Sequence, residues 1–115
     1  MRRVGEVLEA LEGVVASRKG GAPERSYTSR LLAGGVPAIG AKVTEEAGEL
    51  VQAAAGEGDD RVVAEAADLV YHMLVLLAAR DVPLARVEDE LARRFGVSGL
   101  DEKAARGGPT GGGAA

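Results

Sequence analysis

Residues 45–68 read EEAGELVQAAAGEGDDRVVAEAAD. The segments on both sides of Gly56–Asp59 are rich in alanine, glutamate and valine, and their apolar residues recur with the period of a helix. Only these four residues connect the two segments. Helices joined by so short a connection pack as antiparallel neighbours. The stretch therefore predicts a helical hairpin and, with no strand pattern elsewhere, an all-α fold.

Four acidic side chains are expected to meet across this hairpin. Glu46 and Glu49 are three residues apart on the first helix, and Glu65 and Asp68 repeat that spacing on the second. Residues three or four apart share one face of a helix. Glu49 and Glu65 are each seven residues from the nearer glycine of the connection, so they stand at the same height in an antiparallel pair.

Such a cluster of carboxylates favours a hard divalent cation. Neighbouring like charges repel one another even in solvent, and burying them is costly unless a positive charge lies between them. The flanking residues are mostly alanine rather than compensating bases. Mg²⁺ prefers oxygen ligands and fills its remaining positions with water or phosphate oxygens. The pattern predicts a magnesium site and a phosphate-containing substrate; the alternative is a pair of solvated acidic faces.

Composition narrows the class of protein. The chain has 115 residues and a net charge of −4, from 18 acidic and 14 basic residues. This balance argues against binding nucleic acid through a basic surface. There is no cysteine, which excludes disulfides and agrees with a reduced cytoplasm. Residues 1–17 lack a signal-peptide pattern, and the longest apolar interval, residues 69–79, is too short to cross a bilayer. We expect a soluble, cytoplasmic protein without a membrane segment.

The rest of the chain predicts a bundle of about four to five helices. Ser26 or Thr28 caps a short helix, and Gly34-Gly35 ends it. Pro37 fits the first turn of the next helix, where no N–H donor is needed. Helices are expected over residues 3–17, about 26–33, 37–55, 60–80 and 83–95, with a loop at residues 18–25.

The second hairpin helix also predicts self-association. Beyond Asp68 it is apolar on most sides, and one small chain cannot cover such a helix alone. We expect the bundle to be completed by homodimerisation. A single domain is expected over residues 1–106, followed by a disordered Gly/Ala-rich tail at residues 107–115.

Further segments follow in order along the chain. They are Ser26-Tyr27-Thr28 with Arg30, Lys42-Val43, Asp68-Leu69-Val70-Tyr71-His72, and Ser98-Gly99-Leu100-Asp101-Glu102-Lys103 with Arg106. Together with the two acidic motifs they make the chain resemble the phosphoribosyl-ATP pyrophosphatase family, within the MazG-like superfamily of all-α nucleoside-triphosphate pyrophosphatases. The resemblance runs from about residue 4 to residue 106.

The resemblance implies Mg²⁺-dependent hydrolysis of the α–β phosphoanhydride of phosphoribosyl-ATP to phosphoribosyl-AMP and pyrophosphate, the second step of histidine biosynthesis. By the family's motif, Glu46, Glu49, Glu65 and Asp68 are the metal ligands. Glu45 lies slightly off their face, so it binds a second ion or orients the attacking water. All five acids are candidate catalytic residues, and both one ion and two remain open.

Seven residues are candidate substrate contacts: Tyr27, Thr28, Arg30, Lys42, His72, Lys103 and Arg106. For Lys42 the alternative is an ion pair with an adjacent acid, and for His72 it is a hydrogen-bonded core position. Lys103 and Arg106 suit the phosphate on the second ribose of the substrate; otherwise they form a solvated basic turn.

Two other functions remain open. A housekeeping pyrophosphatase of the same superfamily, acting on dUTP, dCTP or other nucleotides, has the same acidic motif. A non-enzymatic helical dimerisation module needs no metal. A ferritin-like di-iron site is excluded, because it needs Glu-x-x-His on paired helices and the chain has one histidine.

Two positions depart from the family pattern. Ala55 stands where related sequences often carry lysine, so a basic contact is missing or is supplied elsewhere. Gly48 lies inside the acidic motif, at a cost of about 1 kcal/mol relative to alanine in a helix.

Overall fold

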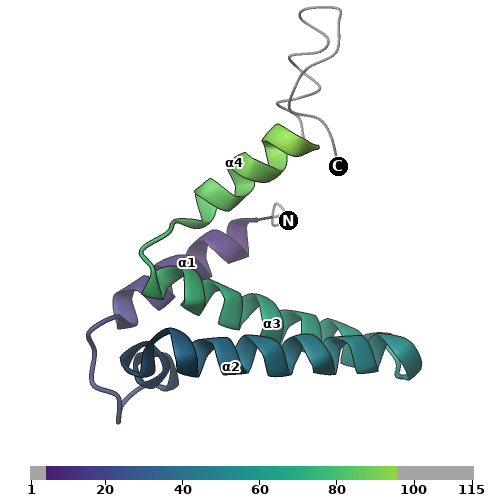
Figure 1. Cartoon of the computed structure of the whole chain (residues 1–115), viewed down its shortest axis with the longest axis horizontal. Coiled ribbons are helices and arrows are strands. Elements are labelled where there is room, and N and C mark those ends of the chain that lie inside the picture. Colours follow the sequence, from purple (N-terminus) through teal and green to yellow (C-terminus); the bar gives the residue numbers. More distant parts are fainter. Residues whose placement is uncertain (1–4, 96–115) are drawn as a thin grey trace, which may run out of the picture. The chain divides into compact units, whose positions relative to one another are not determined.

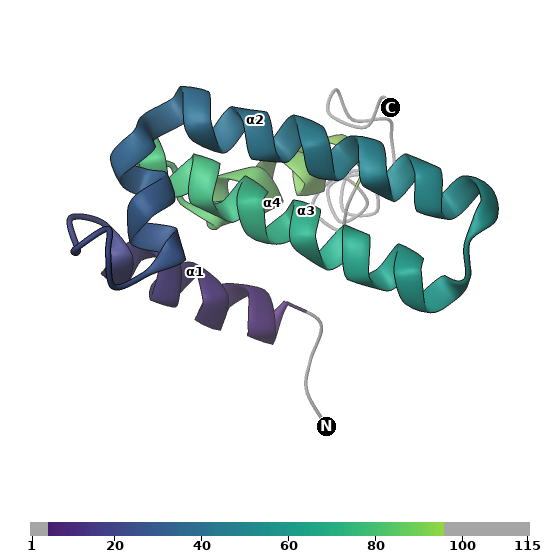
Figure 2. The ribbon, with the colours of Figure 1, turned by 90° about the horizontal axis from the view of Figure 1, so that it is seen from below.

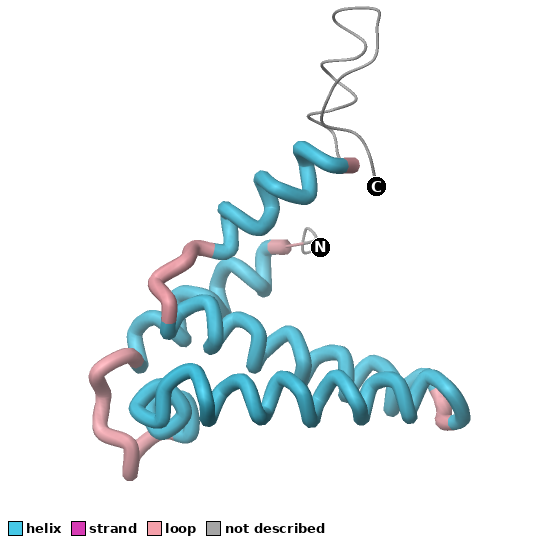
Figure 3. The backbone as a smooth tube through the Cα atoms, in the orientation of Figure 1, coloured by secondary structure: helices cyan, strands magenta, loops and turns pink. Residues whose placement is uncertain are grey.

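The computed structural model describes residues 5–95, and every regular element in this range is a helix (Figures 1 and 3). The elements are α1 (Glu6–Arg18), α2 (Tyr27–Gly56), α3 (Asp59–Ala79) and α4 (Leu84–Arg94). The all-α prediction is confirmed for this range. The chain divides between Val82 and Pro83 into two compact units, the first with α1 to α3 and the second with α4.

Helices α2 and α3 form the expected antiparallel hairpin and lie side by side over most of their length (Figures 1 and 2). The connection between them is held by backbone hydrogen bonds. The N–H of Glu57 donates to Ala53 O at 2.8 Å, and Gly58 O accepts from the N–H groups of Arg61 and Val62 at 3.0 and 3.2 Å. These bonds satisfy groups that a helix end leaves open. The hairpin is therefore closed by a short, bonded turn.

Helix α2 contains a break near its beginning. Gly35 has φ 73° and ψ −170°, a region that is essentially restricted to glycine. Pro37 follows directly after the break, where its missing N–H costs nothing. The sequence predicted two helices separated at Gly34-Gly35. Gly35 is the non-helical residue between two helical stretches of α2, so the predicted separation is confirmed, and the helix axis changes direction at this point (Figure 2).

The start of α2 is fixed by two serines. Ser26 caps the helix, as predicted, and its Oγ accepts a hydrogen bond from the N–H of Ser29 at 3.1 Å. Ser29 Oγ donates in turn to Arg18 O at 2.9 Å, so the end of α1 is tied to the first turn of α2. A Cβ at Gly21 would lie 2.8 Å from Ser29 Oγ, which shows how closely the loop approaches this turn.

The apolar core lies where α1 meets the hairpin, away from the α2–α3 connection. Val15, Leu31, Ile39 and Val75 form its buried cluster, and Tyr71 packs against it. Val15, Ile39 and Val75 are at most 1% exposed, and burying each side chain contributes about 1.5–3 kcal/mol. This core holds one end of the hairpin, and the acidic residues lie between it and the turn.

Helix α3 exposes much apolar surface. It is long and apolar enough to cross a membrane by length and composition alone, and 22% of its apolar window is buried within the chain. The expectation that the chain has no membrane segment therefore remains a prediction. Val51 on α2 and Val63 on α3 are 68% and 67% exposed. These apolar positions are compatible with the predicted homodimer, which also remains a prediction.

Helix α4, described by itself, is a short helix with its own ion pairs. Glu90 accepts hydrogen bonds from Arg93 at 2.6 Å and from Arg94 at 2.8 Å. These two guanidinium groups lower the pKa of Glu90 to about 2. The predicted substrate contacts Lys103 and Arg106, and the predicted tail at residues 107–115, lie outside the described residues.

Candidate active site

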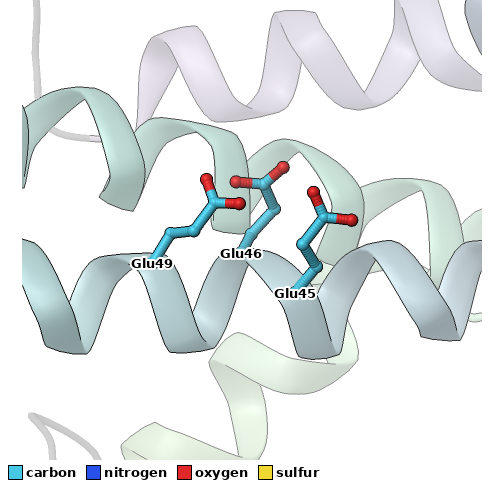
Figure 4. A group of neighbouring side chains, drawn as sticks. All are labelled: Glu45, Glu46 and Glu49. Carbon is cyan, nitrogen blue, oxygen red and sulfur yellow. The ribbon is translucent and has the colours of Figure 1, made fainter.

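The structure brings the five predicted acids together in two overlapping groups. The groups are Glu45, Glu46 and Glu49, and Glu46, Glu65 and Asp68; within each group, one carboxylate oxygen from each residue lies within 4.8 Å of the others. Figure 4 shows the first group, whose side chains point from α2 toward α3. Glu46 belongs to both groups and joins them into one site. The donor atoms are all carboxylate oxygens, which suit hard divalent cations.

The acids of the two groups differ in how far they are buried. Glu46 and Glu65 are only 6% and 4% exposed, whereas Glu45 and Asp68 are exposed. Among residues 5–95, neither Glu46 Oε2 nor Glu65 Oε1 has a hydrogen-bond partner, although both atoms are buried. Buried polar atoms almost always have one, and an uncompensated buried carboxylate is strongly destabilising. Two such oxygens, one from each helix, fit a site that is completed by a cation.

Glu49 connects the two helices electrostatically. Its pKa is raised above the ordinary 4.5, first by burial and then by the charges of Glu46 and Glu65. The charge of Glu65 therefore acts on Glu49 across the two helices, as their equal distance from the turn led us to expect. A divalent cation would reverse the effect on this pKa by favouring the ionised form.

Two bases lie beside the buried glutamates, each one turn earlier on the same helix. Lys42 Nζ is 3.3 Å from Glu45 Oε2 and 3.7 Å from Glu46 Oε1, and its hydrogen bond with Glu45 raises the pKa of Lys42. Arg61 forms an ion pair with Glu65 Oε2. The interpretation that the acids are flanked mostly by alanine rather than by compensating bases was therefore wrong for Glu65, which Arg61 reaches from four residues away, whereas the ion pair of Lys42 was a predicted alternative.

Arg61 is the site residue that sequence reasoning missed. The signal was its spacing, since Arg61 precedes Glu65 by four residues just as Lys42 precedes Glu46. In this structure Lys42 forms ion pairs with Glu45 and Glu46, as one of its two predicted roles required. Ala55, where related sequences often carry lysine, is exposed on α2. The second base beside the acids is Arg61 of α3.

A hydrogen-bonded set of aromatic and hydroxyl groups joins the start of α2 to α3 next to Asp68. The His72 ring donates from Nδ1 to Asp68 O at 2.8 Å, because a carbonyl can only accept. His72 Nε2 then accepts from the Tyr27 hydroxyl at 3.0 Å. Thr28 Oγ1 and the Tyr71 hydroxyl form a second bond between the same helices. The alternative of a bonded core position for His72 fits its 5% exposure.

The remaining predicted contacts are less closely tied to the acids. Tyr27 stacks on Tyr71 with ring centroids 6.3 Å apart and is 44% exposed, so part of its ring is open to solvent. Arg30 is exposed on the first turn of α2.

Comparisons with known proteins agree on one family. The model of the phosphoribosyl-ATP pyrophosphohydrolase family matches residues 8–95. A phosphoribosyl-ATP pyrophosphatase of Trichlorobacter lovleyi is 55% identical over 100 residues, which cover 87% of this chain and 93% of the relative. One from a Caulobacter species is 53% identical over 107 residues, covering 92% and 98%. One from Pelobacter propionicus is 49% identical over 106 residues, also covering 92% and 98%.

Proposed function

The chain belongs to the phosphoribosyl-ATP pyrophosphohydrolase family, and on that basis we propose how its carboxylate site performs the reaction. It is a hydrolase of histidine biosynthesis that converts phosphoribosyl-ATP to phosphoribosyl-AMP and pyrophosphate. The proposal adds the metal, the residues that bind it and the assembly that completes the fold.

Glu46, Glu49, Glu65 and Asp68 would hold Mg²⁺ between α2 and α3. The observation that carries this proposal is the pair of buried carboxylate oxygens without a partner, Glu46 Oε2 and Glu65 Oε1. When bound, Mg²⁺ neutralises phosphate oxygens and places a water for hydrolysis. Glu45 is exposed and lies in the group with Glu46 and Glu49, so it remains a candidate for holding a second ion or for orienting the water.

The basic and hydroxyl residues supply the proposed contacts with the rest of the substrate. Lys42 stands at the exposed edge of the acidic groups, where its ammonium can move from Glu45 to a phosphate oxygen. The half-exposed ring of Tyr27 offers a surface for the substrate. The other proposed contacts are Thr28, Arg30, His72, Lys103 and Arg106; Thr28 and His72 would act through Tyr71 and Tyr27.

We also propose that the protein is a cytoplasmic homodimer with α3 as its central helix. Within residues 5–95, Val51 and Val63 are 68% and 67% exposed, and 22% of the apolar window of α3 is buried, so further apolar cover is favourable. A bilayer is the less favourable cover, because Arg61, Glu65 and Asp68 lie in the same helix and charged groups are costly in hydrocarbon. A second copy would cover Val51, Val63 and the other apolar side chains and leave the carboxylate cluster open to solvent.

The competing function is a housekeeping nucleotide pyrophosphatase, because the acidic groups alone suit any nucleoside triphosphate. Purified protein is to be assayed for pyrophosphate release from phosphoribosyl-ATP, dUTP and dCTP at equal Mg²⁺ concentration. We expect phosphoribosyl-ATP to be strongly preferred, and the gene to restore growth without histidine in a strain that lacks this step. Equal turnover of dUTP or dCTP, or no growth despite soluble protein, would favour the competing function.

A further inference from the structure

We propose that Arg61 is a positioning residue of the carboxylate site: it holds one oxygen of Glu65 so that the other is presented to the divalent cation. This inference rests on the proposed magnesium site and deepens it. Arg61 does not touch the reacting atoms in this account. It acts through Glu65.

The two oxygens of Glu65 have opposite surroundings. Oε2 is paired with the Arg61 guanidinium, whereas Oε1 is buried and has no hydrogen-bond donor within the described part of the chain. Because the first oxygen is already bound, the carboxylate cannot rotate freely to expose the second. The division leaves Oε1 as the oxygen of Glu65 that is available to a cation.

Arg61 is itself anchored to the α2–α3 connection. Its Nε lies 3.4 Å from Glu57 Oε1, and its backbone N–H donates to Gly58 O at 3.0 Å. A guanidinium is a planar fork that can bind two carboxylates in fixed directions. The side chain of Arg61 is 58% exposed and that of Glu65 is 5% exposed, so the guanidinium occupies the solvent side of the carboxylate.

The other helix shows a looser version of the same arrangement. Glu46 Oε1 lies 3.7 Å from Lys42 Nζ, and Glu46 Oε2 is the second buried oxygen without a partner. Each buried glutamate therefore has one oxygen beside a base of its own helix and one oxygen without a donor. Lys42 is nearer to Glu45, at 3.3 Å, so the proposal is made for Arg61 alone.

The direction in which metal affinity changes when Arg61 is removed distinguishes a positioning role from simple charge repulsion. If Arg61 only repelled the cation, its removal would tighten metal binding, by less than about fivefold for a solvent-exposed, screened charge. If Arg61 orients a ligand, its removal weakens metal binding, typically by about 10- to 100-fold for the partner of a metal ligand. Because the loss of ligand orientation is the larger effect, we expect removal of Arg61 to weaken metal binding.

The test is a titration of metal-free protein with Mn²⁺, in which the free ion is measured by electron paramagnetic resonance. We expect Arg61→Gln to weaken Mn²⁺ binding about tenfold and Arg61→Lys to recover part of the loss. Because Arg61 acts through metal affinity, kcat at saturating Mn²⁺ should stay close to the wild-type value. Arg94→Gln is a matched control: Arg94 is 53% exposed and pairs with a glutamate of its own helix, Glu90 at 2.8 Å.

Unchanged or tighter Mn²⁺ binding by folded Arg61→Gln would overturn the proposal, and so would a large fall of kcat at saturating metal. Circular dichroism establishes that each variant is folded. Failure of the proposed function has a different signature, because the wild-type protein would then neither bind Mn²⁺ nor release pyrophosphate. Wild-type protein that does both, beside an unaffected Arg61→Gln, contradicts only the role of Arg61.

Discussion

Glu46 and Glu65 are the buried carboxylates of the site, and each keeps one oxygen without a partner. Their like charges are tolerated because the apolar core at the far end of the hairpin holds α2 and α3 together. Repulsion between these carboxylates therefore lowers the stability of the metal-free protein, and binding of a cation would raise it again.

Removing one charge from the cluster should lower activity without lowering the stability of the metal-free protein. We expect Glu49→Gln to lower turnover at least about 100-fold, because loss of a ligand should cost more than loss of a ligand's partner. The same change should raise the melting temperature of metal-free protein, since it relieves the repulsion that raises the pKa of Glu49. Asp68→Asn is expected to abolish turnover and to spare the melting temperature.

Thermal denaturation in EDTA and a pyrophosphate assay in Mg²⁺ measure these two effects. Glu9→Gln, at an exposed position on α1, controls for the loss of a surface charge and should change neither. A large fall in the melting temperature of metal-free Glu49→Gln would mean that this acid is a structural residue.

The raised pKa of Glu49 also predicts a pH dependence. Between 4.5 and its higher folded value, the folded protein binds more protons at this group than the unfolded chain does. The stability of metal-free protein should therefore fall as pH rises through this window, relative to Glu49→Gln. Below about pH 4.5 the difference between the two proteins should level off, because Glu49 is protonated in both states. Melting temperatures from pH 4 to pH 7 test this; parallel profiles would contradict it.

Residue spacing predicted which acids meet, because a helix of known rise and a short turn fix their heights. Spacing did not predict the contact between Arg61 and Glu65, since a flexible side chain four residues away can point to solvent equally well. Nor could it show which acids are buried, because burial depends on how closely the two helices pack.

At the scale of the elements, the break in α2 directs the first turn of this helix, with Tyr27 and Thr28, toward α3. Two glycines of α2 offer a matched test. Gly35→Ala should destabilise the protein by about 1–3 kcal/mol, because alanine is strained at this φ and ψ. Gly40→Ala should stabilise it by about 0.5–1 kcal/mol, since a Cβ there meets nothing within 4 Å. Urea denaturation measures both; equal effects would mean that the break is not required.

The element boundaries were largely predictable from local signals. The glycine connection and the Ser26 cap both stand where expected, and the ends of the hairpin helices at the connection differ by one residue from the prediction. The break at Gly35 was also predictable, because the Gly34-Gly35 pair is a signal that ends a helix. No described residue explains Gly48, since a Cβ there would meet no atom of residues 5–95 within 4 Å.

At the scale of the whole molecule, the apolar surface of the hairpin carries the prediction of a homodimer. We expect wild-type protein, purified without detergent, to have the mass of a dimer by light scattering. Val63→Asp should weaken the dimer at least about tenfold, because a charge would be buried in an apolar interface. Ser17→Asp, at an exposed position on the last turn of α1, is the control. A monomeric wild type would contradict the dimer, and a need for detergent would support the membrane alternative.

The assembly is the part that the sequence specified least. An apolar helix shows that cover is needed, but a second copy, another protein and a bilayer all supply apolar contacts. The charges of Arg61, Glu65 and Asp68 in the same helix argue against the bilayer alone, by their cost in hydrocarbon.

The central claim is that carboxylates of α2 and α3 hold Mg²⁺ for the hydrolysis of phosphoribosyl-ATP. Its most direct test is the release of pyrophosphate from phosphoribosyl-ATP as Mg²⁺ is titrated, for wild-type protein and for Glu46→Gln, whose altered residue belongs to both acidic groups. We predict release by the wild type that rises with Mg²⁺ and stops in EDTA, and none by Glu46→Gln at any Mg²⁺ concentration. Release that persists in EDTA, or that Glu46→Gln retains at the wild-type rate, would contradict the account.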